Sequence, residues 1–261
     1  SCCDAGVWLG RNVGDKSSAP SSLSTDGTPF EGNRFYSCAK LSFCDSCNQM
    51  QTLTEIALAK AVRGVFTREQ AALWVGSRGA RLDALLKRTV ASREVSRIHR
   101  GLYCLSDRYT QGRINPLELA QIVYGPSYIS LETDLSEHGW IPEGVQAVTS
   151  VSLGRSRGVE TPVGLFSFTR VPQRTLLAGV RRIALDQGGA YYLATPLKAL
   201  ADLVYTRRVD WRSAAPVVES LRVEEESLAA LTGELFDEVM TAYEPGRVTR
   251  FLTGLRKDLT L

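Results

Sequence analysis

Two stretches of this chain decide its fold: VFTREQAALWVGSRGARLDALL, residues 65–86, and VSRIHRGLYCL, residues 95–105. In the first stretch, Thr67 can accept hydrogen bonds from the free backbone N–H groups that begin a helix. Gln70 follows it at the three-residue spacing of a capping box. We therefore expect a short helix over residues 68–74, ended by the glycine at position 76.

Helical patterns flank this short helix on both sides. Before it, apolar residues recur near helical spacing over residues 52–62, and a glycine follows as a stop signal. After it, Ser77 is expected to cap a third helix, whose leucines at positions 82, 85 and 86 recur at steps of three and four residues. A helix, a short helix, a turn and a further helix of this size form the arrangement of a helix-turn-helix.

The second stretch indicates which kind of helix-turn-helix to expect. Apolar and polar residues alternate along residues 95–105, as in a strand, around a His-Arg-Gly corner where glycine can adopt a positive φ. This predicts a two-stranded wing that carries Arg97 and Arg100 beside the third helix. The expected fold class is α+β: an N-terminal winged helix-turn-helix over residues 50–108, followed by a mixed α/β C-terminal domain over residues 109–261.

The residues expected to contact DNA are the basic side chains that the predicted core leaves outside. Arg78 and Arg81 lie near the N-terminal end of the third helix, which usually meets the bases, and the planar guanidinium of arginine suits the O6 and N7 acceptors of guanine. The other cations are better placed for phosphate contacts, which position a protein without reading sequence. They are Lys87 and Arg88 on the helix and Arg97 and Arg100 on the wing.

The distribution of charge supports the same interpretation. The whole chain has a net charge of only +3. Residues 50–108 hold eleven Lys and Arg against five Asp and Glu, a net of +6, whereas residues 1–49 and 109–261 have net charges of −1 and −2. A basic block beside nearly neutral segments is typical of a nucleic-acid-binding domain, although an ordinary solvated basic face gives the same count.

Residues 1–49 differ in composition from the rest. They contain five of the six cysteines and little periodic apolar pattern, so they cannot bury enough surface to offset the entropy lost on ordering. We expect this segment to be disordered, or to be a non-native leader before a natural start at Met50. Cys38, Cys44 and Cys47 include the C-x-x-C spacing of a zinc knuckle, but no second well-spaced pair completes a four-ligand site.

The chain carries no pattern of membrane insertion or export. No apolar run approaches the roughly 20 residues that span a bilayer. The first residues also lack the basic flank and apolar stretch of a secretory signal. We therefore expect a cytoplasmic protein that does not bind membranes.

Residues 109–261 show helical and strand patterns in turn. Helices are expected over residues 116–123, over 132–138, from Pro196 onward with Thr195 as the cap, and over much of the chain after 214. Strands are expected over residues 145–151, 164–170 and 191–193, with a Gly- and Arg-rich loop over 154–159.

No pattern in this second half indicates a catalytic site. Gly188-Gly189 lacks the spaced glycines and the lysine of a phosphate-binding loop, and the acidic run at 224–226 is typical of a solvated face. Lys198 and Asp202 are four residues apart on one predicted helix, which is the spacing of an ordinary salt-linked pair.

The histidines and the remaining cysteine also have simple interpretations. His99 is interpreted as a turn residue, and we expect no cluster of acids to form a metal site around it or around His138. Cys104 is expected to be a small buried residue. We therefore expect a binding protein rather than an enzyme, with no catalytic residues, no cofactor and no metal.

Several motifs together resemble the AbiEi antitoxins, an abortive-infection family. In the first half they are RGVFT at 63–67, the Leu-x-x-Leu-Leu of the third helix, and IHRGLY at 98–103. In the second half they are YIS at 128–130 before a helix ending at His138, AVT at 147–149, and ATPLKALADL at 194–203. The resemblance covers about residues 52–210 and does not reach residues 1–49.

The resemblance implies a non-enzymatic antitoxin encoded beside a nucleotidyltransferase-like toxin. Its winged helix would repress its own operon by binding double-stranded operator DNA at repeated sites, on which copies of the chain could associate. Its C-terminal domain would counteract the toxin in the type IV manner, without a stable toxin–antitoxin complex. The DNA-binding role is carried over only to the basic residues between Arg78 and Arg100.

Two other functions are compatible with the same DNA-binding half. One is a stand-alone winged-helix transcription factor whose C-terminal domain senses a small molecule, and a neighbouring toxin gene would separate it from the antitoxin. The other is a nuclease or nucleic-acid-modifying enzyme, against which the lack of Asp and Glu clustered with His or Lys argues.

Overall fold

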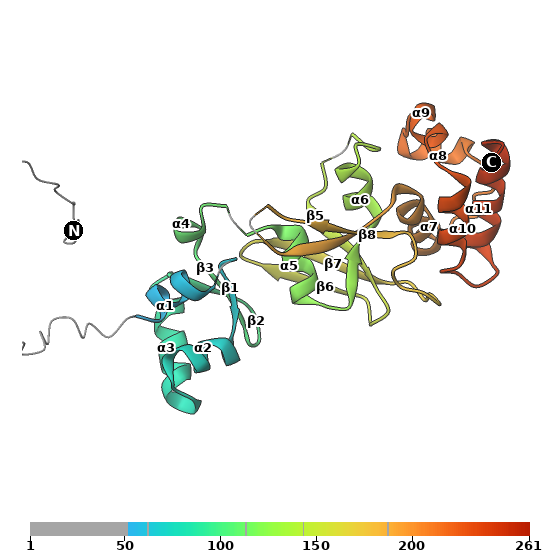
Figure 1. Cartoon of the computed structure of the whole chain (residues 1–261). Helices are drawn as coiled ribbons and strands as arrows, with labels where there is room; N and C mark the ends of the chain where they lie inside the picture. The colour runs from blue at the N-terminus through green and yellow to red at the C-terminus, as the bar shows by residue number, and fades with distance from the viewer. Residues whose placement is uncertain (1–51, 62, 113, 143, 187) are drawn as a thin grey trace, which may run out of the picture. The chain divides into compact units, whose positions relative to one another are not determined.

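The computed structural model describes residues 52–261 apart from positions 62, 113, 143 and 187. Within these residues the chain is α+β, with eleven helices and two sheets (Figure 1). The expectations for residues 1–49, namely disorder, a leader and the cysteine spacing, lie outside the described part. No helix of that part is long and apolar enough to cross a membrane.

Six elements form the first part of the fold, drawn in blue to green in Figure 1. They are α1 (Leu53–Lys60), β1 (Val65–Thr67), α2 (Arg68–Val75), α3 (Gly79–Ala91), β2 (Val95–His99) and β3 (Leu102–Leu105). The strands pair antiparallel in the order β1-β3-β2. The three helices and the β2–β3 hairpin agree with the expectation, whereas β1 is an additional strand.

Helix α2 begins and ends as predicted. Thr67 Oγ1 accepts the Gln70 N–H at 3.2 Å, and Gln70 Oε1 accepts the Thr67 N–H at 2.8 Å, so the capping box is made. Gly76 ends the helix with φ +59°, a left-handed conformation that glycine adopts without steric cost.

Helix α3 begins later than predicted, because Ser77 closes α2 instead of capping α3. The Ser77 N–H donates to the Ala72 carbonyl at 3.2 Å. Arg78 occupies the N-cap position of α3 without a side-chain cap hydrogen bond. The prediction of Ser77 as the cap is wrong because Gly76 ends α2 with a positive φ and α3 starts only at Gly79, which also has a positive φ.

The core of this first part forms between one face of α3 and the sheet. Leu82 and Leu86 are buried in one cluster with Phe66 and Tyr103, whose rings stack at 5.8 Å. Leu85, predicted to face inward, is only half-buried. The opposite face of α3 is therefore left to polar and basic residues.

The second part of the fold is a six-stranded mixed sheet with flanking helices (Figure 1). Its strands, in the spatial order β6-β7-β5-β4-β9-β8, are β4 (Ser127–Ile129), β5 (Ala147–Ser152), β6 (Arg157–Thr161), β7 (Gly164–Arg170), β8 (Val180–Ala184) and β9 (Ala190–Ala194). The β4–β9 and β5–β7 pairs are parallel and the other pairs are antiparallel. Its helices are α4 (Asp107–Thr110), α5 (Pro116–Val123), α6 (Leu131–Glu137), α7 (Pro196–Arg207), α8 (Ala215–Leu221), α9 (Glu225–Ala229), α10 (Gly233–Met240) and α11 (Arg247–Asp258).

Both faces of this sheet are buried, because successive side chains of a strand point to opposite sides. In β4, Tyr128 belongs to the cluster formed with α6, α7 and the C-terminal helices, whereas Ile129 belongs to the cluster formed with α5 and β7. The second cluster also includes Ile98, Leu102 and Cys104 from the hairpin. Apolar packing is therefore continuous across residue 108.

Most of the elements expected in this part are present. The bounds of α5 and β7 are the predicted ones, and α7 begins at Pro196 as predicted. Thr195 occupies the N-cap position as predicted, but its hydroxyl accepts no cap hydrogen bond and donates instead to the Gly179 carbonyl at 3.0 Å. The start of α7 thus depends on proline at its first turn.

The predicted loop over residues 154–159 is wrong, because β6 begins at Arg157. Arg157, Gly158 and Glu160 are exposed on the outer strand of the sheet, so no alternating apolar pattern marks them in the sequence. The strand forms by antiparallel pairing with β7, from Arg157 opposite Phe168 to Thr161 opposite Gly164. β8 is a further strand that we did not expect.

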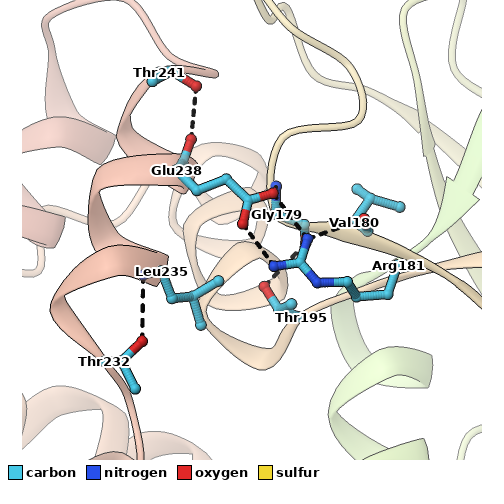
Figure 2. A network of polar contacts seen from close by, with 8 residues as sticks. All are labelled: Gly179, Val180, Arg181, Thr195, Thr232, Leu235, Glu238 and Thr241. Carbon is cyan, nitrogen blue, oxygen red and sulfur yellow. Dashed lines mark hydrogen bonds and ion pairs between the residues drawn. The ribbon is translucent and has the colours of Figure 1, made fainter.

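Figure 2 shows the hydrogen bonds that connect α10 to the start of β8. The Glu238 carboxylate accepts the Gly179 N–H at 2.8 Å and the two terminal nitrogens of Arg181 at 2.8 and 2.6 Å. These contacts, above all the hydrogen bonds from Arg181, lower the pKa of Glu238 from 4.5 to about 2. Gly179 has φ +72°, and a Cβ there would lie 2.5 Å from the Val239 side chain, so this close approach requires glycine.

Candidate nucleic-acid interface

The six basic residues predicted to contact DNA are all exposed. Arg78 precedes α3, Arg81, Lys87 and Arg88 lie along it, Arg97 lies on β2, and Arg100 lies in the turn of the hairpin. None of the six forms an ion pair with another described residue. Their charges are therefore available to an anionic partner.

An open groove of about 890 Å³ brings three of these cations together. Lys87 comes from α3, and Arg97 and Arg100 come from the hairpin. The apolar lining between these two elements is Leu86, Val90 and Tyr103. Arg78, Arg81 and Arg88 do not line the groove. The structure therefore divides the six predicted residues into three that line the groove and three, at the start of α3 or along it, that do not.

The helical repeat explains this division. Arg81 and Arg88 are seven residues apart, close to two turns, so they lie in one row along α3. Asp83 and Lys87 are one turn apart and lie in another row, on the side that faces the groove. Ala84, between the two rows, is exposed and carries only a methyl group.

Sequence reasoning missed an ion pair in this groove. Arg68, the first residue of α2, donates from Nε and Nη2 to Asp83 Oδ1, at 3.0 and 2.8 Å. These hydrogen bonds raise the pKa of Arg68 above its ordinary value. The residues are 15 positions apart on different helices, so only the turn between α2 and α3 brings them together.

The hairpin corner is held by its own polar groups. Arg97 Nε donates to the His99 carbonyl at 3.3 Å, and His99 Nδ1 lies 3.0 Å from the Arg100 carbonyl. Gly101 has φ +85°, in agreement with the expected glycine corner. His99 was expected to be a turn residue, but it is the last residue of β2 and pairs with Leu102, so the turn itself is Arg100-Gly101. The corner presents the side chains of Arg97 and Arg100 to solvent.

Lys198 and Asp202 are not the ordinary salt-linked pair that their spacing predicts. Both side chains are fully buried, and no ion pair joins them among the described contacts. The Asp202 carboxylate accepts hydrogen bonds from Tyr128 and Tyr243, both at 2.7 Å, and from Ser130 at 2.8 Å. Gln173 donates to the same carboxylate at 3.3 Å and accepts from Lys198. We call these residues the Asp202 cluster: Tyr128, Ser130, Gln173, Lys198, Asp202 and Tyr243.

Lys198 is placed differently within the Asp202 cluster. Its Nζ donates to Gln173 Oε1 at 2.8 Å and lies 4.2 Å from the centre of the Tyr243 ring. Burial lowers the pKa of Lys198, an effect that the nearby Asp202 opposes. Because the residues of the cluster are buried and hydrogen-bonded to one another, its evident effect is to connect α7 to β4 and to the C-terminal helices.

Asp134 on α6 is a second buried carboxylate on this side of the sheet. It is fully buried, and neither of its oxygens has a hydrogen-bond partner among the described residues. His138 Nε2 lies 3.7 Å from its Oδ2. Burial, followed by the charge of Asp202, raises the pKa of Asp134 well above its ordinary value. Asp134 and His138 are four residues apart, so their spacing in the sequence could have indicated this contact.

The described residues contain no group of three or more His, Cys, Asp and Glu side chains that could hold a metal ion. Cys104 is buried, as predicted, and burial raises the pKa of its thiol to about 11. A thiol with this pKa is a poor nucleophile near neutral pH.

Comparisons with known proteins do not assign this chain. No protein-family model matches it, and no curated protein is significantly similar to it. Functional assignment therefore depends on the site geometry and on the motif resemblance.

Proposed function

We propose that residues 50–108 form a winged helix-turn-helix that binds double-stranded operator DNA, and that the chain is a transcriptional autorepressor and antitoxin of the AbiEi kind. It acts in the cytoplasm, without catalytic residues, metal or cofactor. Its second partner is a nucleotidyltransferase-like toxin, which it counteracts without forming a stable complex.

The groove between α3 and the β2–β3 hairpin carries the DNA-binding part of this proposal. Three unpaired cations from the helix and the hairpin line it, which suits a phosphate backbone passing between them. The order α1-β1-α2-α3-β2-β3, with a three-stranded sheet, is compatible with a winged helix whose α3 enters the major groove. Arg78 and Arg81 then lie at the N-terminal end of that helix.

The antitoxin part of the proposal is supported by the motif resemblance alone. One structural observation limits which residues of the second part could contact a toxin: residues 197–203, within the motif ATPLKALADL, are all buried. This motif therefore maintains the fold of the second part and does not contact a partner. Antitoxin activity in this proposal depends on the exposed surface of residues 109–261.

Salt-dependent DNA binding tests the first part. Each lost phosphate contact lowers the slope of log affinity against log salt by about one, so Arg97→Ala and Arg100→Ala should each weaken binding to all sequences in this way. Arg81→Ala should instead cost roughly 1–3 kcal/mol on the specific site by removing a base contact. Arg182→Ala is the matched control, because Arg182 is exposed on β8, outside the groove. Unchanged binding in all three groove and helix variants would exclude these DNA contacts.

Repression and protection should be separable in the full-length chain. A variant with Arg78, Arg81, Arg97 and Arg100 all changed to alanine should lose repression of a promoter reporter yet still protect cells from the toxin encoded beside it. These four side chains are exposed, so the substitutions should hardly affect folding. A folded quadruple variant that no longer protects would contradict the division of the two activities.

A further inference from the structure

Asp83 is an acidic residue on the basic surface that we propose binds DNA. It is the only acidic residue between positions 79 and 91, on a helix that otherwise carries Arg81, Lys87 and Arg88. Its side chain is 59% exposed and lines the groove. A carboxylate here opposes the approach of phosphates, so it weakens DNA binding unless it makes a compensating contact.

The contacts of Asp83 leave one of its oxygens available. Arg68 donates both of its hydrogen bonds to Oδ1, and no described residue donates to Oδ2. Arg68 is itself held at the start of α2, because its backbone N–H donates to the Gly101 carbonyl at 2.8 Å. The carboxylate is therefore oriented before any ligand arrives, with a free acceptor.

We propose that Asp83 reads a cytosine in the major groove, with Oδ2 accepting a hydrogen bond from the exocyclic N4 amine. This inference rests on the proposed DNA-binding function and specifies which base the site selects. A carboxylate is purely an acceptor, and cytosine N4 is a donor, whereas the major-groove edges of guanine and the O4 of thymine present acceptors that a carboxylate repels. Adenine offers a donor beside an acceptor and suits an amide better.

The surroundings of Asp83 allow a duplex to approach it. Ala80 and Ala84 are exposed, and their side chains do not extend beyond a methyl group. Arg68 acts as a positioning residue, because it contacts the carboxylate and not the base. Its cation also partly offsets the repulsion between Asp83 and the phosphates.

The test is selection from a pool of DNA duplexes with a randomised core, using the full chain. Wild type, Asp83→Ala, Asp83→Asn, Arg68→Gln and Glu69→Gln are compared after their folding has been checked by urea unfolding. Glu69 is the matched control, because it is an exposed acid that lines the same groove from α2. Its substitution removes the same charge without removing the proposed acceptor.

We expect wild type to enrich a cytosine at one position of its selected site. Asp83→Ala should lose about tenfold of the discrimination at that position alone. Asp83→Asn should move the preference there toward adenine, and Glu69→Gln should strengthen binding without changing the selected sequence. Arg68→Gln should reduce the preference at the same position, because the carboxylate is no longer held.

Other outcomes would overturn the inference. If Asp83→Ala selects the wild-type sequence with undiminished discrimination, Asp83 reads no base, and its role is confined to the ion pair. If wild type binds duplexes without any sequence preference, the inference fails although DNA binding remains. If wild type binds no duplex in the pool, the proposed function itself fails, which distinguishes the two.

Discussion

The groove beside α3 and the Asp202 cluster both join an aspartate to basic and polar side chains, but they differ in what surrounds them. Asp83 is 59% exposed and forms an ion pair with Arg68. Asp202 is fully buried and accepts hydrogen bonds from three hydroxyl groups, those of Tyr128 and Ser130 at the end of β4 and that of Tyr243 after α10. The exposed carboxylate of Asp83 can form a hydrogen bond with a ligand, whereas the buried carboxylate of Asp202 already has its hydrogen-bond donors within the protein.

This difference shows that residue type and spacing do not separate a binding site from a structural one. Lys198 and Asp202 have the spacing of a surface pair, yet both are in the core. Arg68 and Asp83 have no regular spacing, yet they form a direct surface ion pair. Accessibility to solvent decides whether a charge can serve recognition, since a buried charge is committed to its protein partners.

The largest expected effect is the loss of Asp202. Asp202→Ala should lower the free energy of unfolding by about 3 kcal/mol or more, because it leaves buried hydroxyl donors without their acceptor and removes a negative charge near Lys198. Asp202→Asn should cost less, since it keeps one acceptor oxygen. Asp237→Ala is the control, because Asp237 pairs with Arg256 at the surface and should contribute less than about 1 kcal/mol. Urea unfolding of the full chain measures all three, and equal losses for Asp202→Ala and Asp237→Ala would contradict the cluster's structural role.

A smaller effect on the free energy of unfolding is expected at Glu238, whose exposure lies between that of Asp83 and that of Asp202. Its folded-state pKa of about 2 lies below the ordinary 4.5, so its ionised form stabilises the fold above pH 4.5, and this contribution is lost as the pH falls toward 2. The carboxylate is 38% exposed, and solvent screening reduces the contribution to about 1 kcal/mol. Wild type should therefore lose about this much more stability than Glu238→Gln between pH 6 and pH 2.5. Parallel pH profiles of the two proteins would exclude the effect.

The smallest effect on stability is expected in the groove. Arg97→Ala and Arg100→Ala should each change the free energy of unfolding by no more than about 0.5 kcal/mol, because both side chains are exposed and unpaired with described acids. The same urea unfolding measurement checks this. A loss near that of Asp202→Ala would show that the groove cations maintain the fold, and the contrast between the two regions would then be wrong.

The sequence predicted the elements that depend on neighbours within a few residues. The Thr67–Gln70 capping box, the start of α7 at Pro196 and the glycine corner of the hairpin all follow from local hydrogen bonds and backbone conformation. The exposure of Arg78, Arg81, Lys87 and Arg88 was predicted for a related reason: the periodic leucines of α3 indicate which face of the helix is buried, so the other face is exposed.

By itself, then, the sequence determined the local helices and hairpin, the basic character of residues 50–108 and the exposed cations, because these depend on short-range pattern and composition. Only the tertiary structure decided the pairing of Arg68 with Asp83, the edge strand β6, and the burial of Lys198 and Asp202. Each of these depends on a partner elsewhere in the chain. Asp202, for example, is held by Tyr128 and Tyr243, which lie 74 and 41 residues away. No local pattern records such a partner, since folding alone brings the groups within hydrogen-bonding distance.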